Sequence, residues 1–81
     1  MSNNKEKYTE AFLSALNLDK KLVNEKLEFN SVPEWDSIGH MTLISTLEDS
    51  FNISIETDDV IDFSSYQKGI EILSKKHNIN F

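Results

Sequence analysis

The sequence predicts an all-α fold, a small bundle of three longer helices and one short helix, with a long loop after the first helix. Apolar residues recur at steps of three and four residues in three separate stretches, which is the spacing of one helical face. Ser, Asp and Asn, which favour helix ends, flank these stretches. The strand-like alternation Ile53-Ser54-Ile55 is too short to pair alone. A length of 81 residues predicts one domain over 1–81.

The first helix is expected over about residues 5–17, after a frayed end at 1–4, with Asn17 as its stop. Its apolar face comprises Tyr8, Ala11, Phe12, Ala15 and Leu16. The connection 18–36 is unusually long for a compact domain. We expect it to be an ordered loop with a short helical turn around 19–24, fixed to the core by Leu27 and Phe29.

The second helix is expected over 37–51 and presents the clearest amphipathic pattern. Pro33, the only proline, biases Val32 away from helical geometry. Asp36 and Ser37 are both good N-cap residues, and Asn52 is the expected stop. The apolar positions assigned to one face are Ile38, Met41, Ile44, Leu47 and Phe51.

Two further helices complete the expected fold. Residues 57–61 predict one short helical turn capped by Thr57, after an extended connection that turns Ile53 or Ile55 inward. Ser64 or Ser65 should cap a last helix that ends near His77, with basic residues favourably placed at its C-terminal end. The expected core comprises Phe12, Leu16, Phe29, Met41, Ile44, Leu47, Phe51, Ile55, Ile70 and Leu73.

Charge and composition exclude several classes of function. Acidic residues outnumber basic ones by 14 to 8, which argues against binding to nucleic acid or to anionic membranes and favours basic protein partners. The chain has no cysteine and no apolar run of transmembrane length. No EF-hand pattern is present, so no metal site is expected and the acidic residues are assigned to solvent. We expect a cytoplasmic monomer without membrane insertion.

Ser37 is the main candidate for chemistry, and three interpretations remain. It can be only a helix cap. It can carry an anion covalently, as a phosphodiester, because a helix N-terminus favours negative charge. It can be a hydrolase nucleophile with Asp36 and His40, but Asp36 is poorly placed to orient His40 and no glycine-rich nucleophile elbow is present. We therefore expect no catalytic residues, His40 at the surface, and Trp35 as a loop residue covering the helix start.

The segment Pro33-Glu34-Trp35-Asp36-Ser37-Ile38-Gly39-His40-Met41 resembles the Asp-Ser-Leu signature of acyl carrier proteins and of their peptidyl and D-alanyl carrier relatives. The resemblance extends over nearly the whole chain. It includes Phe29, the segment from Leu47 to Ile55, the acid pair Asp58-Asp59, and Ser64-Ser65-Tyr66.

This resemblance implies a four-helix bundle of acyl-carrier-protein type with a short third helix. It also implies that a phosphopantetheinyl transferase attaches 4′-phosphopantetheine to Ser37, and that Asp36 helps to position the serine. The carrier itself would catalyse nothing. It would present an acyl or aminoacyl thioester to the ligase, synthase or transferase enzymes of a fatty-acid, lipid, polysaccharide or secondary-metabolite pathway. An unmodified carrier-like interaction module, or a D-alanyl or peptidyl carrier, remains an alternative.

The chain departs from the fatty-acid-synthesis pattern at several positions. Gly39 and Thr42 stand where that pattern usually has acids, Ile38 replaces a leucine, and Trp35 replaces a small residue. These changes favour a specialised carrier over a housekeeping one. The expected docking face comprises Ile38, Met41, Thr42, Glu48, Asp49 and Asp58.

Overall fold

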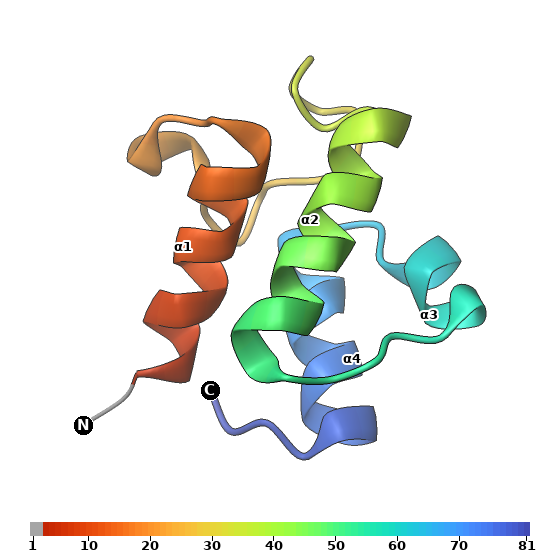
Figure 1. The fold of residues 1–81 in the computed structure, drawn as a ribbon. Coiled ribbons are helices and arrows are strands. Elements are labelled where there is room, and N and C mark those ends of the chain that lie inside the picture. Colours follow the sequence, from red (N-terminus) through yellow and green to blue (C-terminus); the bar gives the residue numbers. More distant parts are fainter. Residues whose placement is uncertain (1–2) are drawn as a thin grey trace.

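A computed structural model describes residues 3–81 and shows that this part of the chain is helical, with no strand. The elements are α1 (Asn4–Leu16), the 3-10 turn η1 (Lys20–Leu22), α2 (Ser37–Phe51), α3 (Thr57–Asp62) and α4 (Tyr66–His77). Figure 1 shows α1 and α2 side by side and antiparallel, α3 on the side of α2 away from α1, and α4 behind α2 in this view. The predicted all-α class, with three longer helices and one short one, is confirmed. Within residues 3–81 no helix combines the length and apolarity needed to cross a membrane.

Short polar side chains set the helix ends. Asp36 and Ser65 cap α2 and α4 by accepting from backbone N–H groups, and Asn17 and Asn52 end α1 and α2 in the left-handed conformation, as predicted. The expectation of a frayed end is wrong for residues 3 and 4. Asn3 caps α1 through the Glu6 N–H and Asn4 begins the helix, so these residues are not frayed, whereas Met1 and Ser2 lie outside the described residues.

The cap of the short helix also differs from the prediction. Glu56, not Thr57, occupies the N-cap position of α3, and its side chain makes no capping hydrogen bond. Thr57 is the first helical residue instead. The start of α3 therefore depends on contacts with the rest of the fold more than on a local cap.

The predicted core is largely confirmed, with one clear error on α2. Six of its members are buried, namely Phe12, Leu16, Ile44, Leu47, Ile55 and Leu73; three, namely Phe29, Phe51 and Ile70, are partly buried against them. Met41 is 59% exposed, and the fully buried residue nearby is Leu43. The reason is helical rotation: at about 3.6 residues per turn, Met41 lies six residues and therefore some 120° of rotation from Leu47, whereas Leu43 lies four residues from it.

Aromatic rings fill the centre between α1, α4 and the long loop. Tyr8 and Phe12 of α1 contact one another at 5.0 Å between ring centroids, and Phe12 contacts Trp35 at 5.3 Å and Tyr66 at 5.4 Å. The Tyr8 hydroxyl donates to the Tyr66 carbonyl at 2.8 Å. Burial raises the pKa of Tyr8 well above its ordinary value, so the hydroxyl remains a donor at neutral pH. These contacts join the two ends of the chain around one aromatic core.

The long loop is ordered by backbone hydrogen bonds to the start of α4. Phe29 N–H donates to the Ser64 carbonyl and Tyr66 N–H donates to the Leu27 carbonyl, both at 2.9 Å. Leu27 is buried and Phe29 partly buried, as predicted for the residues that fix this loop. The loop therefore has a fixed position when it reaches the start of α2.

One acidic residue assigned to solvent is in fact buried. Asp59 of α3 is 2% exposed, and Lys76 Nζ of α4 lies 2.7 Å from its Oδ1 atom. The hydrogen bond to Asp59 raises the pKa of Lys76. Since a buried carboxylate needs a charged or hydrogen-bonding partner, this pair fixes α3 against α4.

The revised core face of α2 predicts opposite results for two neighbouring positions. Leu43→Ala should lower the free energy of unfolding by about 2–5 kcal/mol because it leaves a cavity. Met41→Ala should change it by less than about 0.5 kcal/mol because the side chain is already in solvent. Urea denaturation of the two variants measures both values, and a larger loss for Met41→Ala would restore the original assignment.

Candidate functional site

The start of α2 places Ser37 at the surface on a well-defined turn. Ser37 is the first residue of the helix and is exposed. The Asp36 carboxylate accepts from the Gly39 N–H at 2.8 Å, and the Asp36 carbonyl accepts from the His40 N–H at 2.8 Å. Nothing in residues 3–81 hydrogen-bonds the Ser37 hydroxyl. Asp36, and not Ser37, is therefore the cap, and the serine hydroxyl is available for reaction.

The preceding turn holds this helix start in place. Asn30, at φ 66°, donates its N–H to the Trp35 carbonyl, and Trp35 N–H donates to the Val32 carbonyl. The Trp35 side chain is fully buried. Asp36 and Ser37 thus come directly after a residue that is fixed in the core. The sequence predicts only that Trp35 covers the helix start, whereas its side chain is fully buried.

His40 is half-buried and hydrogen-bonded through both ring nitrogens, which corrects the prediction of a free surface residue. Trp35 Nε1 donates to His40 Nδ1 at 2.9 Å, and His40 Nε2 lies 2.8 Å from the Val60 carbonyl oxygen. An indole N–H can only donate, so Nδ1 must be the acceptor and Nε2 must carry the proton donated to Val60. The Val60 carbonyl lies in the last turn of α3, where carbonyls lack helical partners. His40 therefore links the Trp35 turn, α2 and α3.

This arrangement bears on the hydrolase interpretation of Ser37. Both ring nitrogens of His40 are hydrogen-bonded to groups other than the serine. A general base needs a free nitrogen within reach of the proton that it removes. The geometry thus gives Ser37 no base in His40.

Gly39 is required for close packing. This requirement explains why the position has no acidic residue. A Cβ atom built there would collide with the Glu34 carbonyl oxygen and lie 3.0 Å from Leu16 Cδ2. Any side chain at residue 39 would displace the turn before Ser37. The glycine is explained by this steric constraint, so it says nothing about which partners the protein recognises.

Three exposed apolar side chains lie around this site. They are Ile38 at 79%, Met41 at 59% and Ile61 at 74% exposure. Ile38 and Met41 are three residues apart on α2 and therefore neighbours. Ile61 is not among the residues expected from the sequence, although only one residue of the pair Val60-Ile61 can face the core of a single-turn helix. We refer to Ile38, Met41 and Ile61 as the apolar patch.

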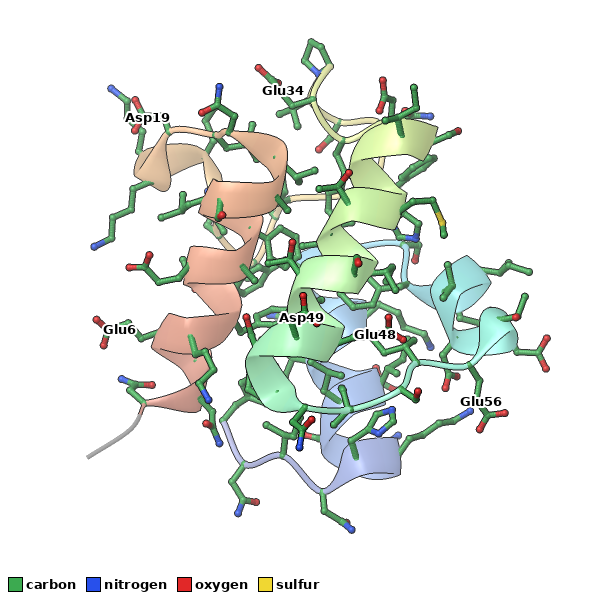
Figure 2. All side chains as sticks on the ribbon, in the orientation of Figure 1. Glu6, Asp19, Glu34, Glu48, Asp49 and Glu56 are labelled. Carbon is green, nitrogen blue, oxygen red and sulfur yellow. The ribbon has the colours of Figure 1, made fainter. Side chains whose placement is uncertain are left out.

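The polar residues of the expected docking face have different surroundings. Thr42, Asp49 and Asp58 are exposed. Glu48 is half-buried, and its carboxylate accepts from the Ile55 N–H at 2.8 Å, so it also holds the connection between α2 and α3. Figure 2 shows labelled acidic side chains on both sides of the molecule, with Glu6 and Asp19 on the α1 side and Glu48, Asp49 and Glu56 toward α2 and α3. Acidic charge is therefore not confined to the expected docking face.

A small apolar hollow lies between α2 and α3, next to this site. It has a volume of about 230 Å³ and is lined by Phe29, His40, Val60, Ile61, Phe63 and Ser64. His40 is three residues from Ser37 on α2, so the hollow begins within one helical turn of the serine. We refer to it as the α2–α3 hollow.

Neither metal binding nor similarity to known sequences adds to this description. Among residues 3–81 no three His, Cys, Asp or Glu side chains come together in a way that could hold a metal ion. No family model and no curated protein sequence matches the chain. The candidate function therefore depends on the geometry of the site and on the motif around Ser37.

The two hydrogen bonds of His40 can be tested separately by substitution. His40→Asn keeps an acceptor near the Trp35 N–H, His40→Gln keeps a donor near the Val60 carbonyl, and His40→Ala removes both. Each unpaired buried group should cost about 1–3 kcal/mol, so His40→Ala should be the least stable of the three in urea denaturation. If His40→Ala matched the wild-type chain, the hydrogen bonds would not hold α3 in place.

Gly39→Ala provides a test of the steric constraint. An alanine in a helix normally stabilises by about 1 kcal/mol relative to glycine. Here we expect a loss of about 1–3 kcal/mol, because the added methyl overpacks the site against Glu34 and Leu16. Thr42→Ala, at an exposed position on the same helix, is the control and should have little effect. A more stable Gly39→Ala protein would contradict the close approach.

Proposed function

We propose that this protein is a carrier that bears 4′-phosphopantetheine on Ser37. A phosphopantetheinyl transferase would install the group, and its terminal thiol would hold an acyl cargo as a thioester for partner enzymes. The observation that carries the proposal is the exposed, unpartnered Ser37 hydroxyl on the first turn of α2, within the Asp-Ser-Ile motif. The protein's own part is to present the serine and the surface around it.

The residues around Ser37 fit a covalently attached phosphodiester. Its phosphate would lie at the N-terminus of a 15-residue helix, where backbone N–H groups and the helix dipole favour negative charge. The neighbouring Asp36 carboxylate would repel a free phosphate ion. A covalent linkage does not depend on such affinity, so this pair of residues suits a modification site better than a site for a dissociable anion.

The proposed modification is a phosphoryl transfer in which Ser37 is the nucleophile. The serine oxygen forms a bond to the pantetheine-bearing phosphorus of coenzyme A, and the pyrophosphate bond of coenzyme A breaks. The nucleotide half leaves with the electron pair, and the transferase takes up the hydroxyl proton. Asp36 supports this step by capping α2 through Gly39, which fixes the backbone that presents Ser37.

The apolar patch supports docking of enzymes next to the modified serine. Ile38, Met41 and Ile61 offer apolar contact area, while exposed Asp49 and Asp58 lie on the same two helices and favour basic partners. Thr42 leaves the centre of this surface uncharged. We therefore propose that the protein serves a dedicated ligase and a dedicated acceptor enzyme. These partners would belong to a surface-polysaccharide, lipid-modification or secondary-metabolite pathway. The absence of cysteine suits the reducing cytoplasm, where we place it as a monomer.

Modification of Ser37 is directly measurable. Incubation with coenzyme A and a broad-specificity transferase should add one phosphopantetheine mass to the intact chain. Ser37→Ala should remain unmodified, and its free energy of unfolding should change by less than about 0.5 kcal/mol because Asp36 provides the cap. Ser45→Ala, at an exposed serine of the same helix, is the matched control and should still be modified.

Two results would count against the proposal. Modification of the Ser37→Ala chain at another serine would remove Ser37 as the site. A wild-type chain that stays unmodified with several transferases would favour the alternative, an interaction module that binds partners through the apolar patch alone.

A further inference from the structure

We propose that a second hollow, formed by α1, the long loop and α4, binds a short zwitterionic peptide of the size of a dipeptide with apolar side chains. We refer to it as the α1–α4 hollow. The inference goes beyond the proposed function, because no residue of α2 or α3 lines this hollow. Three features carry it, namely unpaired charges of opposite sign, a free hydroxyl hydrogen and the volume.

Hydrogen bonds hold two walls of the α1–α4 hollow in place. In the loop wall, the Asn24 side chain accepts from the Lys26 N–H at 2.8 Å and donates to the Lys21 carbonyl at 3.3 Å. In the α4 wall, the Tyr66 N–H donates to the Leu27 carbonyl of the loop at 2.9 Å. The loop and α4 therefore form a surface that exists before any ligand binds, as is usual for small-ligand sites.

Two charges of opposite sign line the hollow, and neither has a counter-ion. Lys5 of α1 and Glu25 of the loop form no ion pair with one another or with any other residue among 3–81. Glu25 accepts only from the side-chain amide of Gln67, at 3.2 Å, so one of its carboxylate oxygens is unused. A ligand with an ammonium group at one end and a carboxylate at the other complements both charges.

The hydroxyl groups of Thr9 and Tyr66 leave one hydrogen without an acceptor. Their oxygens lie 2.9 Å apart and share a single hydrogen bond. Whichever hydroxyl donates, the hydrogen of the other has no acceptor within residues 3–81. Tyr66 is 4% exposed, and both residues line the hollow. A carbonyl or carboxylate oxygen of a bound peptide can accept this hydrogen in place of water.

The apolar lining and the volume set the size of the ligand. Val23 of the loop and Ile70 of α4 place apolar side chains among the polar groups. An apolar cavity of about 150 Å³ holds a benzene molecule, so about 380 Å³ holds about fifteen non-hydrogen atoms at the same density. A dipeptide such as leucyl-valine matches this size. Its central amide separates its two charges, which suits a lysine and a glutamate that do not pair with one another.

Titration of the intact, unmodified chain with leucyl-valine at low salt, followed by ¹H–¹⁵N NMR, tests the proposal. We expect saturable shifts of the backbone amides of Thr9, Tyr66 and Ile70, with a Kd of about 1 mM or tighter. Low salt keeps exposed charges effective. N-acetyl-leucyl-valine lacks the ammonium group and leucyl-valinamide lacks the carboxylate. Each should bind about two- to fivefold more weakly than the free dipeptide.

Two substitutions assign each end of the peptide to its partner. Glu25→Gln should bind the free and N-acetylated peptides equally, because the partner of the ammonium group is gone. Lys5→Gln should lose the preference for the free peptide over leucyl-valinamide. Glu10→Gln and Lys20→Gln remove the same charges outside the hollow and should keep both preferences. All four positions are exposed, so each variant should fold.

Four results would overturn the inference. The first is the absence of saturable shifts at the hollow, and the second is equal affinity of the unsubstituted chain for free and blocked peptides. The third is loss of the preferences in the control variants as well, which would indicate a general effect of charge. The fourth is free leucine binding as tightly as leucyl-valine, which contradicts the assigned size. Because the titration uses the chain without a group on Ser37, its outcome is separate from that of the proposed function.

Discussion

The site depends on two hydrogen bonds of His40, one from the Trp35 indole and one to the Val60 carbonyl. They connect the turn before Ser37, the first turn of α2 and the last turn of α3. α3 has only six residues and no side-chain cap, so it needs external contacts to keep its position. His40 provides one from α2, and the pairing of Asp59 with Lys76 provides another from α4. Both ring nitrogens of His40 are hydrogen-bonded, and Asp59 is paired through its Oδ1 atom, as polar groups in a small core require.

The same constraint gives the two sides of α2 different roles. The side that faces the core carries Leu43 and Leu47, which are fully buried. The other side leaves Ile38 and Met41 in solvent, within one turn of Ser37 on the same helix. Neighbouring exposed apolar residues are typical of a surface that another protein covers.

Local sequence signals predicted the helices well because each depends on neighbouring residues. The spacing of apolar residues predicts the three longer helices, Asp36 before Ser37 marks the start of α2, and Asn17 and Asn52 mark the ends of α1 and α2. The tertiary features were not predictable in this way. His40 depends on Trp35, which is close in sequence, and on the Val60 carbonyl, which is twenty residues away, so no periodic pattern indicates its burial. The steric role of Gly39 depends on the Glu34 carbonyl. On α2 the apolar residues from Ile38 to Leu47 stand three apart, and such a row rotates around the helix and does not stay on one face.

We propose that Ser37 carries 4′-phosphopantetheine in the living cell. Peptide mapping of the protein isolated from its own cells tests this most directly, because it requires no chosen transferase or cargo. We expect the peptide containing Trp35, Asp36 and Ser37 to carry one phosphopantetheine group, and fragmentation to assign this group to Ser37. Recovery of this peptide only in the unmodified form, from cells in which the protein is active, would show that Ser37 is not the attachment site.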